Sequence, residues 1–279
     1  MSGLWKLSGL AALLLLLNGY SASQAAVPSG QVIAVVQSAE VDGASGHLVL
    51  QPASSVYSGD RIVTGSVGQA QVRFADNTKL VIGPNSSMVI DAFVFDSAGT
   101  ANKFSINAVK GAFRFITGTS AKNAYSITTP TATIGLRGTK FDFVVDNGGS
   151  TRLIQLEGST LICKRGHNGK KRDCVVSNVV CGVTFVPGWN GPIFGVGTQD
   201  TNERNVEIAQ YFQYVRNQKG LLAAFRADMT GCGSLSYAPY GSSFANANPP
   251  PLAPPASAPV SSPPPCPPPC PPRCPPRGD

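Results

Sequence analysis

The side chains best suited to chemistry in this sequence are few, and their spacing does not assemble a catalytic site. Only two histidines occur, His47 and His167, and neither has a second histidine or a cysteine at metal-ligand spacing. The sequence contains no Gly-x-Ser-x-Gly motif and no glycine fingerprint for phosphates or dinucleotides. Asp142 and Glu157 are weak candidates for a carboxylate pair, and surface strand positions are the favoured interpretation. We therefore predict no catalytic residue, no metal and no cofactor.

Seven cysteines supply the remaining reactive groups, and this number favours an oxidising compartment. Four of them, Cys163, Cys174, Cys181 and Cys232, precede the proline-rich end of the chain, and four cysteines allow three pairings. We prefer a Cys163–Cys174 bridge, which would close a short loop and stabilise the fold by roughly 3 kcal/mol on the chain-entropy model. Cys181 and Cys232 would then tie the last β segment to the end of a helical region.

The other three cysteines are Cys266, Cys270 and Cys274, spaced four apart in a proline-rich tail. In a polyproline II segment, at ~3.1 Å per residue, neighbouring tail cysteines are about 12 Å apart, which is too far for a disulfide. Because the total is odd, at least one cysteine stays free or pairs with another molecule. We hypothesise intermolecular thiol pairing and a disulfide-linked oligomer, and incidental exposed thiols are the alternative.

A cluster of basic residues lies between Cys163 and Cys174, around a glycine-rich turn that predicts a hairpin tip. One interpretation is a solvated charged hairpin that discourages edge aggregation. The other is a binding site for an anionic surface, either an envelope protein or an anionic glycan. The five basic residues are Lys164, Arg165, Lys170, Lys171 and Arg172.

The elements that position these residues are mainly β-strands. Residues 70–74 and 141–145 alternate apolar and polar side chains, a pattern that places one set on a core face. Glycine, asparagine and aspartate recur between such runs, at spacings of roughly 8–12 residues that suggest a sandwich, a barrel or a solenoid. Residues 200–220 predict a helix that begins at Asp200 and ends near Gly220, and a second helical piece is expected over 221–229. We expect this helical region to pack on the β core, with partner binding as the alternative.

The two ends of the chain have different compositions. Residues 1–25 have the charge, apolar core and small-residue site of a secretory signal, and an uncleaved anchor is the alternative. Residues 246–279 are proline-rich and predict an extended, disordered tail. No other segment is apolar enough to span a membrane, so no transmembrane segment is expected in the mature chain. The net charge of +7 is a mild basic excess, and it does not indicate nucleic acid as a partner.

The β region resembles the FecR domain over roughly residues 46–165. The first half of the resemblance consists of Gly59-Asp60, Thr64-Gly65, the strand 70–74, the turn 76–78, the strand 80–82 and the corner 83–86. The second half consists of "VKGAFRF" (109–115), "ITTPTATIGLRGTKFDFVV" (127–145) and "LIQLEGSTLI" (153–162). Each piece is short, and their joint order carries the resemblance.

The resemblance implies an exported bacterial FecR module that is periplasmic or secreted. Its fold would be mainly β, with stacked short strands in a solenoid-like arrangement or, alternatively, a β-sandwich. The expected organisation is a β domain over 26–190 and a helical extension over 191–245, between the signal and the tail. Unlike the best-known members, the chain shows no cytoplasmic anti-sigma domain and no transmembrane helix. A non-enzymatic binding or scaffold role is expected, and the alternative is iron-related envelope signalling through a separate membrane partner.

Two turns in the resembling region receive structural roles. Arg137 lies between Gly135 and Gly138, and we predict that its guanidinium pins adjacent loops by donating to their carbonyls, with a ligand contact as the alternative. Gly59 and Asp60 predict a turn in which the carboxylate accepts backbone N–H groups. The aspartates of this region lack the spacing of a calcium loop.

Overall fold

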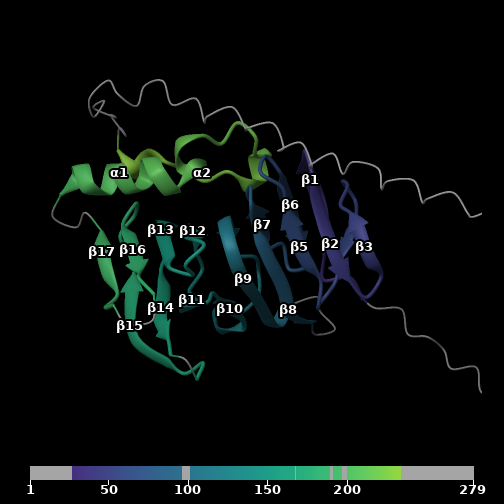
Figure 1. Ribbon diagram of the computed structural model, residues 1–279, viewed down its shortest axis with the longest axis horizontal. Coiled ribbons are helices and arrows are strands. Elements are labelled where there is room, and N and C mark those ends of the chain that lie inside the picture. Colours follow the sequence, from purple (N-terminus) through teal and green to yellow (C-terminus); the bar gives the residue numbers. More distant parts are fainter. Residues whose placement is uncertain (1–26, 96–100, 167, 189–190, 197–199, 234–279) are drawn as a thin grey trace, which may run out of the picture. The chain divides into compact units, whose positions relative to one another are not determined.

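The computed structural model describes residues 27–95, 101–166, 168–188, 191–196 and 200–233 of the chain. The predicted signal at 1–25, the tail at 246–279 with its three cysteines, and His167 lie outside the described residues. Within the described ranges the chain forms 17 β-strands and two α-helices, and the prediction of a mainly β fold is confirmed. In Figure 1 the first strands, β1 to β3, lie on the right and the last strands, β15 to β17, lie on the left.

The strands are arranged in two layers, which we call layer A and layer B. Neighbours in layer A are all antiparallel. Its order is β4 (Ser55–Val56), β1 (Gly30–Val36), β6 (Gln69–Phe74), β7 (Lys79–Ile82), the second part of β9 (Ala101–Ile116), β12 (Lys140–Val145), β13 (Thr151–Glu157), β16 (Val183–Val186) and β17 (Phe194–Val196).

Layer B is antiparallel except where β10 runs parallel to β9. Its order is β3 (Gly46–Val49), β2 (Ala39–Gly43), β5 (Arg61–Thr64), β8 (Ser87–Phe95), the first part of β9, β10 (Tyr125–Thr128), β11 (Ala132–Leu136), β14 (Thr160–Arg165) and β15 (Lys171–Ser177). The chain alternates between the layers every one or two strands, so each stretch of the fold contains both layers. This arrangement combines the stacked strands and the facing sheets that the sequence left as alternatives.

Strand β9 belongs to both layers and joins them into one hydrogen-bonded system. Its first part pairs with β8 and β10, and residues 111–116 pair with β12 in the other layer. The change of layer occurs at Gly111, whose φ is +113°. A β-carbon at this position would collide with Ser86, so glycine is required for both conformation and space.

The core lies between the two layers and is rich in phenylalanine. Phe104 of layer B contacts Phe74 and Phe115 of layer A, with ring centroids 4.8 Å and 5.6 Å apart. All three side chains are buried. Alternation in each strand directs one set of side chains into this core, as the sequence pattern predicted for residues 70–74 and 141–145.

The outer face of layer A is covered by residues 200–233, which we call the C-terminal strap. It contains α1 (Thr201–Tyr211), α2 (Gln213–Arg216) and the short 3₁₀ turns Ala223–Phe225 and Thr230–Cys232. Ile208, Phe212 and Val215 are buried against Ile154 and other residues of layer A, so the expected packing of the helix on the β core is present. Figure 1 shows the two helices running along one side of the strands.

The start of the strap agrees with the prediction, and three other details of this part of the chain differ from it. Asp200 caps the helix as predicted, by accepting the N–H of Asn202 at 2.7 Å. The predicted continuous helix is broken at Phe212, whose φ and ψ of −109° and 73° are not helical. The second helical piece is reduced to one 3₁₀ turn, and the β region runs on to Val196 instead of ending at 190.

Candidate binding surface

The predicted basic hairpin is present and is formed by β14 and β15. Its turn is closed by two backbone hydrogen bonds, from Gly166 to Lys170 at 2.9 Å and from Gly169 to Gly166 at 2.8 Å. Cys163 and Cys174 face each other across the two strands and form a disulfide, with Cα atoms 4.0 Å apart. The predicted staple at the base of the hairpin is therefore confirmed.

The five basic residues do not form one surface. Lys170, Lys171 and Arg172 are exposed, and Arg165 is half-buried and donates to the carbonyl of Thr129 at 3.4 Å. Lys164 is buried, and its ammonium donates to the carbonyl of Gly191. The expectation that Lys164 contributes to an anion-binding surface is wrong. We use the term basic edge for Lys170, Lys171 and Arg172.

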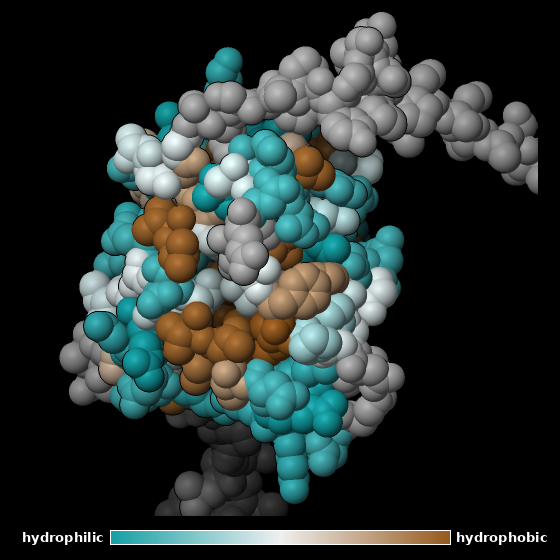
Figure 2. All heavy atoms as spheres, turned by 90° about the vertical axis from the view of Figure 1, so that its left-hand side faces the viewer, coloured by the Kyte–Doolittle hydropathy of each residue, from teal (hydrophilic) through white to brown (hydrophobic). Residues whose placement is uncertain are grey.

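Lys171 and Arg172 of the basic edge lie on β15, the outermost strand of layer B, and Lys170 directly precedes it. Among the described residues, β15 pairs with β14 alone, so its outer backbone groups face away from the sheet. Apolar side chains are exposed at the same end of the molecule, which Figure 2 views directly. They are Val176 on β15, Val179 and Val180 in the following loop, and Phe194 on β17.

Cys181 and Cys232 form the second disulfide, with Cα atoms 5.1 Å apart. Cys181 follows the β15 strand and Cys232 lies in the last turn of the strap. The bridge fixes the end of the strap beside layer A, as the sequence predicted. Two disulfides indicate that the protein folds in an oxidising compartment outside the cytoplasm.

The strap also covers a buried ion pair between Arg114 on β9 and Asp142 on β12. The guanidinium donates to both carboxylate oxygens, from Nε to Oδ1 at 2.6 Å and from Nη2 to Oδ2 at 2.9 Å. Its Nη1 donates to the side chain of Gln218 in the strap, and the ring of Tyr214 lies 5.7 Å away. Burial raises the pKa of the Asp142 carboxyl, while the charge and hydrogen bonds of Arg114 oppose that rise. Burial also raises the pKa of Tyr214.

This ion pair corrects the idea that Asp142 and Glu157 are equivalent surface carboxylates. Asp142 is buried and bound to Arg114, whereas Glu157 is exposed and pairs with Lys140 at 2.5 Å. Sequence reasoning also missed Arg114. The sequence pattern that could have revealed it is a charged residue between two phenylalanines, Phe113 and Phe115. This position lies on the face of the strand that points away from the core.

A second arginine, Arg152 on β13, holds the helical part of the strap. Its guanidinium lies between the rings of Tyr211 and Phe185, 3.9 Å and 4.1 Å from their centroids. It also donates from Nε to Glu207 at 3.1 Å and from Nη1 to Asp146 at 3.3 Å. The strap is therefore fixed by apolar packing, two arginine contacts and a disulfide.

The N-terminal half of layer A contacts the strap through amide groups. The side chains of Gln69 and Gln71 both donate to the carbonyl of Gly220 at 3.1 Å, and Gln71 accepts the N–H of Leu222 at 3.0 Å. A separate buried network surrounds Asp76, which accepts hydroxyl hydrogen bonds from Ser120 at 2.7 Å and Tyr125 at 2.6 Å. This network joins the β6–β7 turn to the start of β10 and stabilises the core.

The turn residues singled out in the sequence have different outcomes. Asp60 is buried and accepts the N–H of Tyr57 at 2.8 Å, as expected of a turn carboxylate, and burial raises its pKa. Gly59 and Gly138 have positive φ, at +93° and +70°. Gly135 has ordinary backbone geometry and room for a β-carbon.

Arg137 does not make the contacts that the pin hypothesis requires. Its side chain is exposed and makes no hydrogen bond to any described residue, while its backbone N–H donates to Ser159 at 3.1 Å. The physical reason is strand geometry, because Leu136 enters the core and its neighbour therefore points outward. Arg114 and Arg152 have the holding role instead, and they act on the strap.

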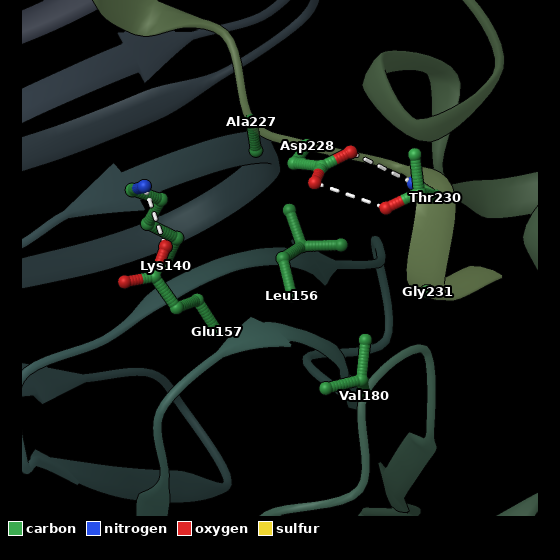
Figure 3. Close-up of a pocket in the computed structure, with 8 residues that line it drawn as sticks. All are labelled: Lys140, Leu156, Glu157, Val180, Ala227, Asp228, Thr230 and Gly231. Atoms are coloured by element: carbon green, nitrogen blue, oxygen red, sulfur yellow. Dashed lines mark hydrogen bonds and ion pairs between the residues drawn. The ribbon is translucent and has the colours of Figure 1, made fainter.

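A hollow of about 240 Å³ lies between β13, β12 and the end of the strap. Figure 3 shows Lys140 and Glu157 on one side and Asp228 with Thr230 on the other. Each charged group there already has a partner, because Lys140 pairs with Glu157, and Asp228 accepts from the N–H and the hydroxyl of Thr230 at 2.9 Å and 3.0 Å. These hydrogen bonds lower the pKa of Asp228. In the described part of the chain, no three His, Cys, Asp or Glu side chains group as metal ligands.

Comparison with known families identifies the middle of the chain. The family model described as FecR protein matches residues 60–160. These residues form a FecR domain. The matched range lies within the 46–165 that the motifs indicated, so the resemblance is confirmed. The FecR domain covers the strands from β5 to β13, and most of the basic hairpin and all of the strap lie outside it.

The similarity to solved structures is weaker than the match to the FecR family model. Two crystal structures of a proposed anti-sigma factor from Parabacteroides distasonis are 13% and 14% identical, with TM-scores of 0.39 and 0.40. Each alignment covers 48% of this chain and 58% of that protein, so the chain spans little more than half of it. A structure named "Cell surface anchoring domain" is 27% identical over 22% of this chain and 82% of its own length, with a TM-score of 0.21. No curated protein matches, and no helix among the described residues is long and apolar enough to cross a membrane.

Proposed function

We propose that this protein is a non-enzymatic, exported binding module of the bacterial envelope that uses its basic edge to bind an anionic partner. The FecR domain over residues 60–160 supports a role in the bacterial envelope. Its role would be to position the hairpin that follows it in the sequence. The partner class is an envelope protein or an anionic glycan.

The observation that carries this proposal is the concentration of positive charge on a rigid support. Lys170, Lys171 and Arg172 are consecutive and exposed, and the disulfide between Cys163 and Cys174 constrains the strands that hold them. A fixed cluster of like charges attracts an anionic surface more strongly than the same charges on a mobile loop, because less conformational entropy is lost on binding. Export is supported by the two disulfides.

The test is association with isolated envelope fragments at low and high salt. The triple variant Lys170→Gln, Lys171→Gln, Arg172→Gln should lose most of its association at low salt, since neutralised side chains no longer attract the anionic surface. A matched control, Arg73→Gln, Lys122→Gln, Lys219→Gln, removes the same charge from exposed positions elsewhere. Equal association of the parent and the hairpin variant at both salt concentrations would reject the proposal.

A second candidate function is a part in envelope signalling, and the FecR match is the observation that favours it. In this case a separate membrane protein would carry the signal across the membrane, and iron uptake would be the process it reports on. Crosslinking in intact cells distinguishes the two candidates. Recovery of a membrane-spanning protein would support signalling, and recovery of glycan or outer-membrane material would support the scaffold role.

A further inference from the structure

The two ends of layer B are both open edges, and their properties are complementary. Among the described residues, β3 pairs with β2 alone and β15 pairs with β14 alone. Figure 1 shows β3 and β15 at opposite ends of the described strands. An open edge with unpaired backbone groups is a template for pairing with another strand.

On both edges, the residues whose N–H and C=O groups face away from the sheet can be identified. The N–H of Leu50 points inward and donates to Ala39 at 2.8 Å, so the groups of Val49, one residue earlier, point outward. On β15 the short Cα separation of 4.0 Å between Cys163 and Cys174 marks a pair without mutual backbone hydrogen bonds. The backbone groups of Cys174 and Val176 therefore also point outward.

Both edges expose apolar side chains, and on β15 these follow the charged residues that guard its first half. Leu48 and Val49 of β3 are 51% and 61% exposed, and Val176 of β15 is 57% exposed. Exposed apolar residues at both ends would be covered if the two edges paired. Asp173 forms a bulge in β15, with a φ of +47°, and the four residues of β3 match in length the regular segment 174–177 that follows it.

The two edges carry opposite charge. Asp42, which is exposed, and Glu40, which is half-buried, lie on β2 on the same face as His47 and Val49 of β3. His47 hydrogen-bonds Asp42 at 2.6 Å. We call Glu40 and Asp42 the acidic edge. Arg61 beside the acidic edge and Asp173 beside the basic edge reduce these charges but do not reverse them.

We propose that the protein associates head to tail, with the β3 edge of one copy paired to the β15 edge of a second copy. This inference rests on the proposed function, because it names a second copy of this chain as an anionic partner of the basic edge. The contact is between two different surfaces, so each copy keeps one free edge and the association continues into rows. Pairing of two β15 edges, or of two β3 edges, would place like charges together.

The test is a charge exchange measured by sedimentation velocity over a range of protein concentrations at low salt. The parent is the full chain with Cys266, Cys270 and Cys274 changed to Ser, so that tail disulfides cannot link copies. The variant Glu40→Lys, Asp42→Lys and the variant Lys170→Glu, Lys171→Glu, Arg172→Glu should each remain monomeric, because their two edges have the same sign. An equimolar mixture of the two should associate again, since each edge then meets its complement.

A matched control, Arg73→Glu, Lys122→Glu, Lys219→Glu, should associate as the parent does. A parent that is monomeric at all concentrations, a mixture that stays monomeric, or reversed variants that associate alone would each overturn the proposal. Envelope association of the Glu40→Lys, Asp42→Lys variant separates the two ideas. If it binds fragments like the parent while the parent does not self-associate, head-to-tail pairing fails and the proposed function stands. If copies associate but neutralising the basic edge leaves envelope binding intact, the proposed function fails instead.

Discussion

Arg114 and Asp142 form a bidentate ion pair, at 2.6 Å and 2.9 Å, that is sealed beneath the C-terminal strap. Changing Asp142 to Asn leaves a buried guanidinium without its counter-charge. We expect a loss of about 3–5 kcal/mol in the free energy of unfolding, measured by urea denaturation. The double variant Arg114→Met, Asp142→Leu removes both charges and should be clearly more stable than Asp142→Asn. Equal losses for the two variants would show that the charge imbalance is not the cause.

Substitution of Arg152 tests the contact between its guanidinium and the aromatic rings that hold the strap. Changing it to Lys keeps the charge but removes the planar group that lies between Tyr211 and Phe185. We expect a loss of about 1–2 kcal/mol in thermal or urea denaturation. Arg73→Lys, at an exposed strand position, is the matched control and should change little. If Arg152→Lys leaves the free energy of unfolding unchanged, the positive charge alone holds the helix.

The two disulfides should differ in their contribution to stability. The bridge between Cys181 and Cys232 closes a loop with a sequence separation of 51, whereas the separation between Cys163 and Cys174 is 11. On the chain-entropy model their removal by paired Cys→Ala changes should cost about 4 and about 3 kcal/mol respectively. Calorimetry of the two double variants measures the order. The opposite order would show that contacts in the folded state outweigh the chain entropy.

Gly111 and Gly135 offer a comparison of two strand glycines. Gly111→Ala forces a side chain into a positive φ and against Ser86, so we expect a loss of more than about 2 kcal/mol. Gly135→Ala has ordinary geometry and free space, so it should be neutral or slightly stabilising. Denaturation of both variants under the same conditions provides the measurement. If Gly135→Ala lowers the free energy of unfolding, this position requires glycine for a reason other than its backbone conformation.

His47 should titrate above its ordinary range. The hydrogen bond and charge of Asp42 raise its pKa, and Glu40 at 3.6 Å adds to the rise. Its stabilising contribution is therefore complete below the unfolded pKa of about 6.5 and is lost as the pH rises through the higher folded value. A proton NMR titration measures this pKa, with His167→Gln to assign the signal. Asp42→Asn should lower the pKa more than Glu40→Gln, and an unchanged value in Asp42→Asn would contradict the assignment.

Local features of the fold were predictable because their causes are local. Alternation identified the strands around Phe74 and Phe143, the capping aspartate located the start of α1, and turn residues located the hairpin tip. The cysteine pairs followed from short loop closure and from the remaining two cysteines. The burial of Lys164 was also predictable in principle. It lies two residues after Ile162 in the same strand, so its side chain points to the same face, toward the core.

Long-range features could not be obtained in this way. Nothing near Arg114 in the sequence shows that Gln218, 104 positions later, will contact it. The contacts of Gln69 and Gln71 with Gly220 likewise join residues about 150 positions apart. The alternation of strand pairs between two layers depends on where β9 bends, and a glycine alone does not reveal which way the chain turns.

The sharing of β9 between the layers has a consequence for how the protein denatures. A single unbroken strand supplies hydrogen-bond partners to four others, two on each side of Gly111. Loss of pairing in one sheet would release half of this strand and expose the core that both sheets share, so the other sheet would lose its support. The body of the protein should lose its structure in one concerted step, with the same midpoint whichever probe follows it.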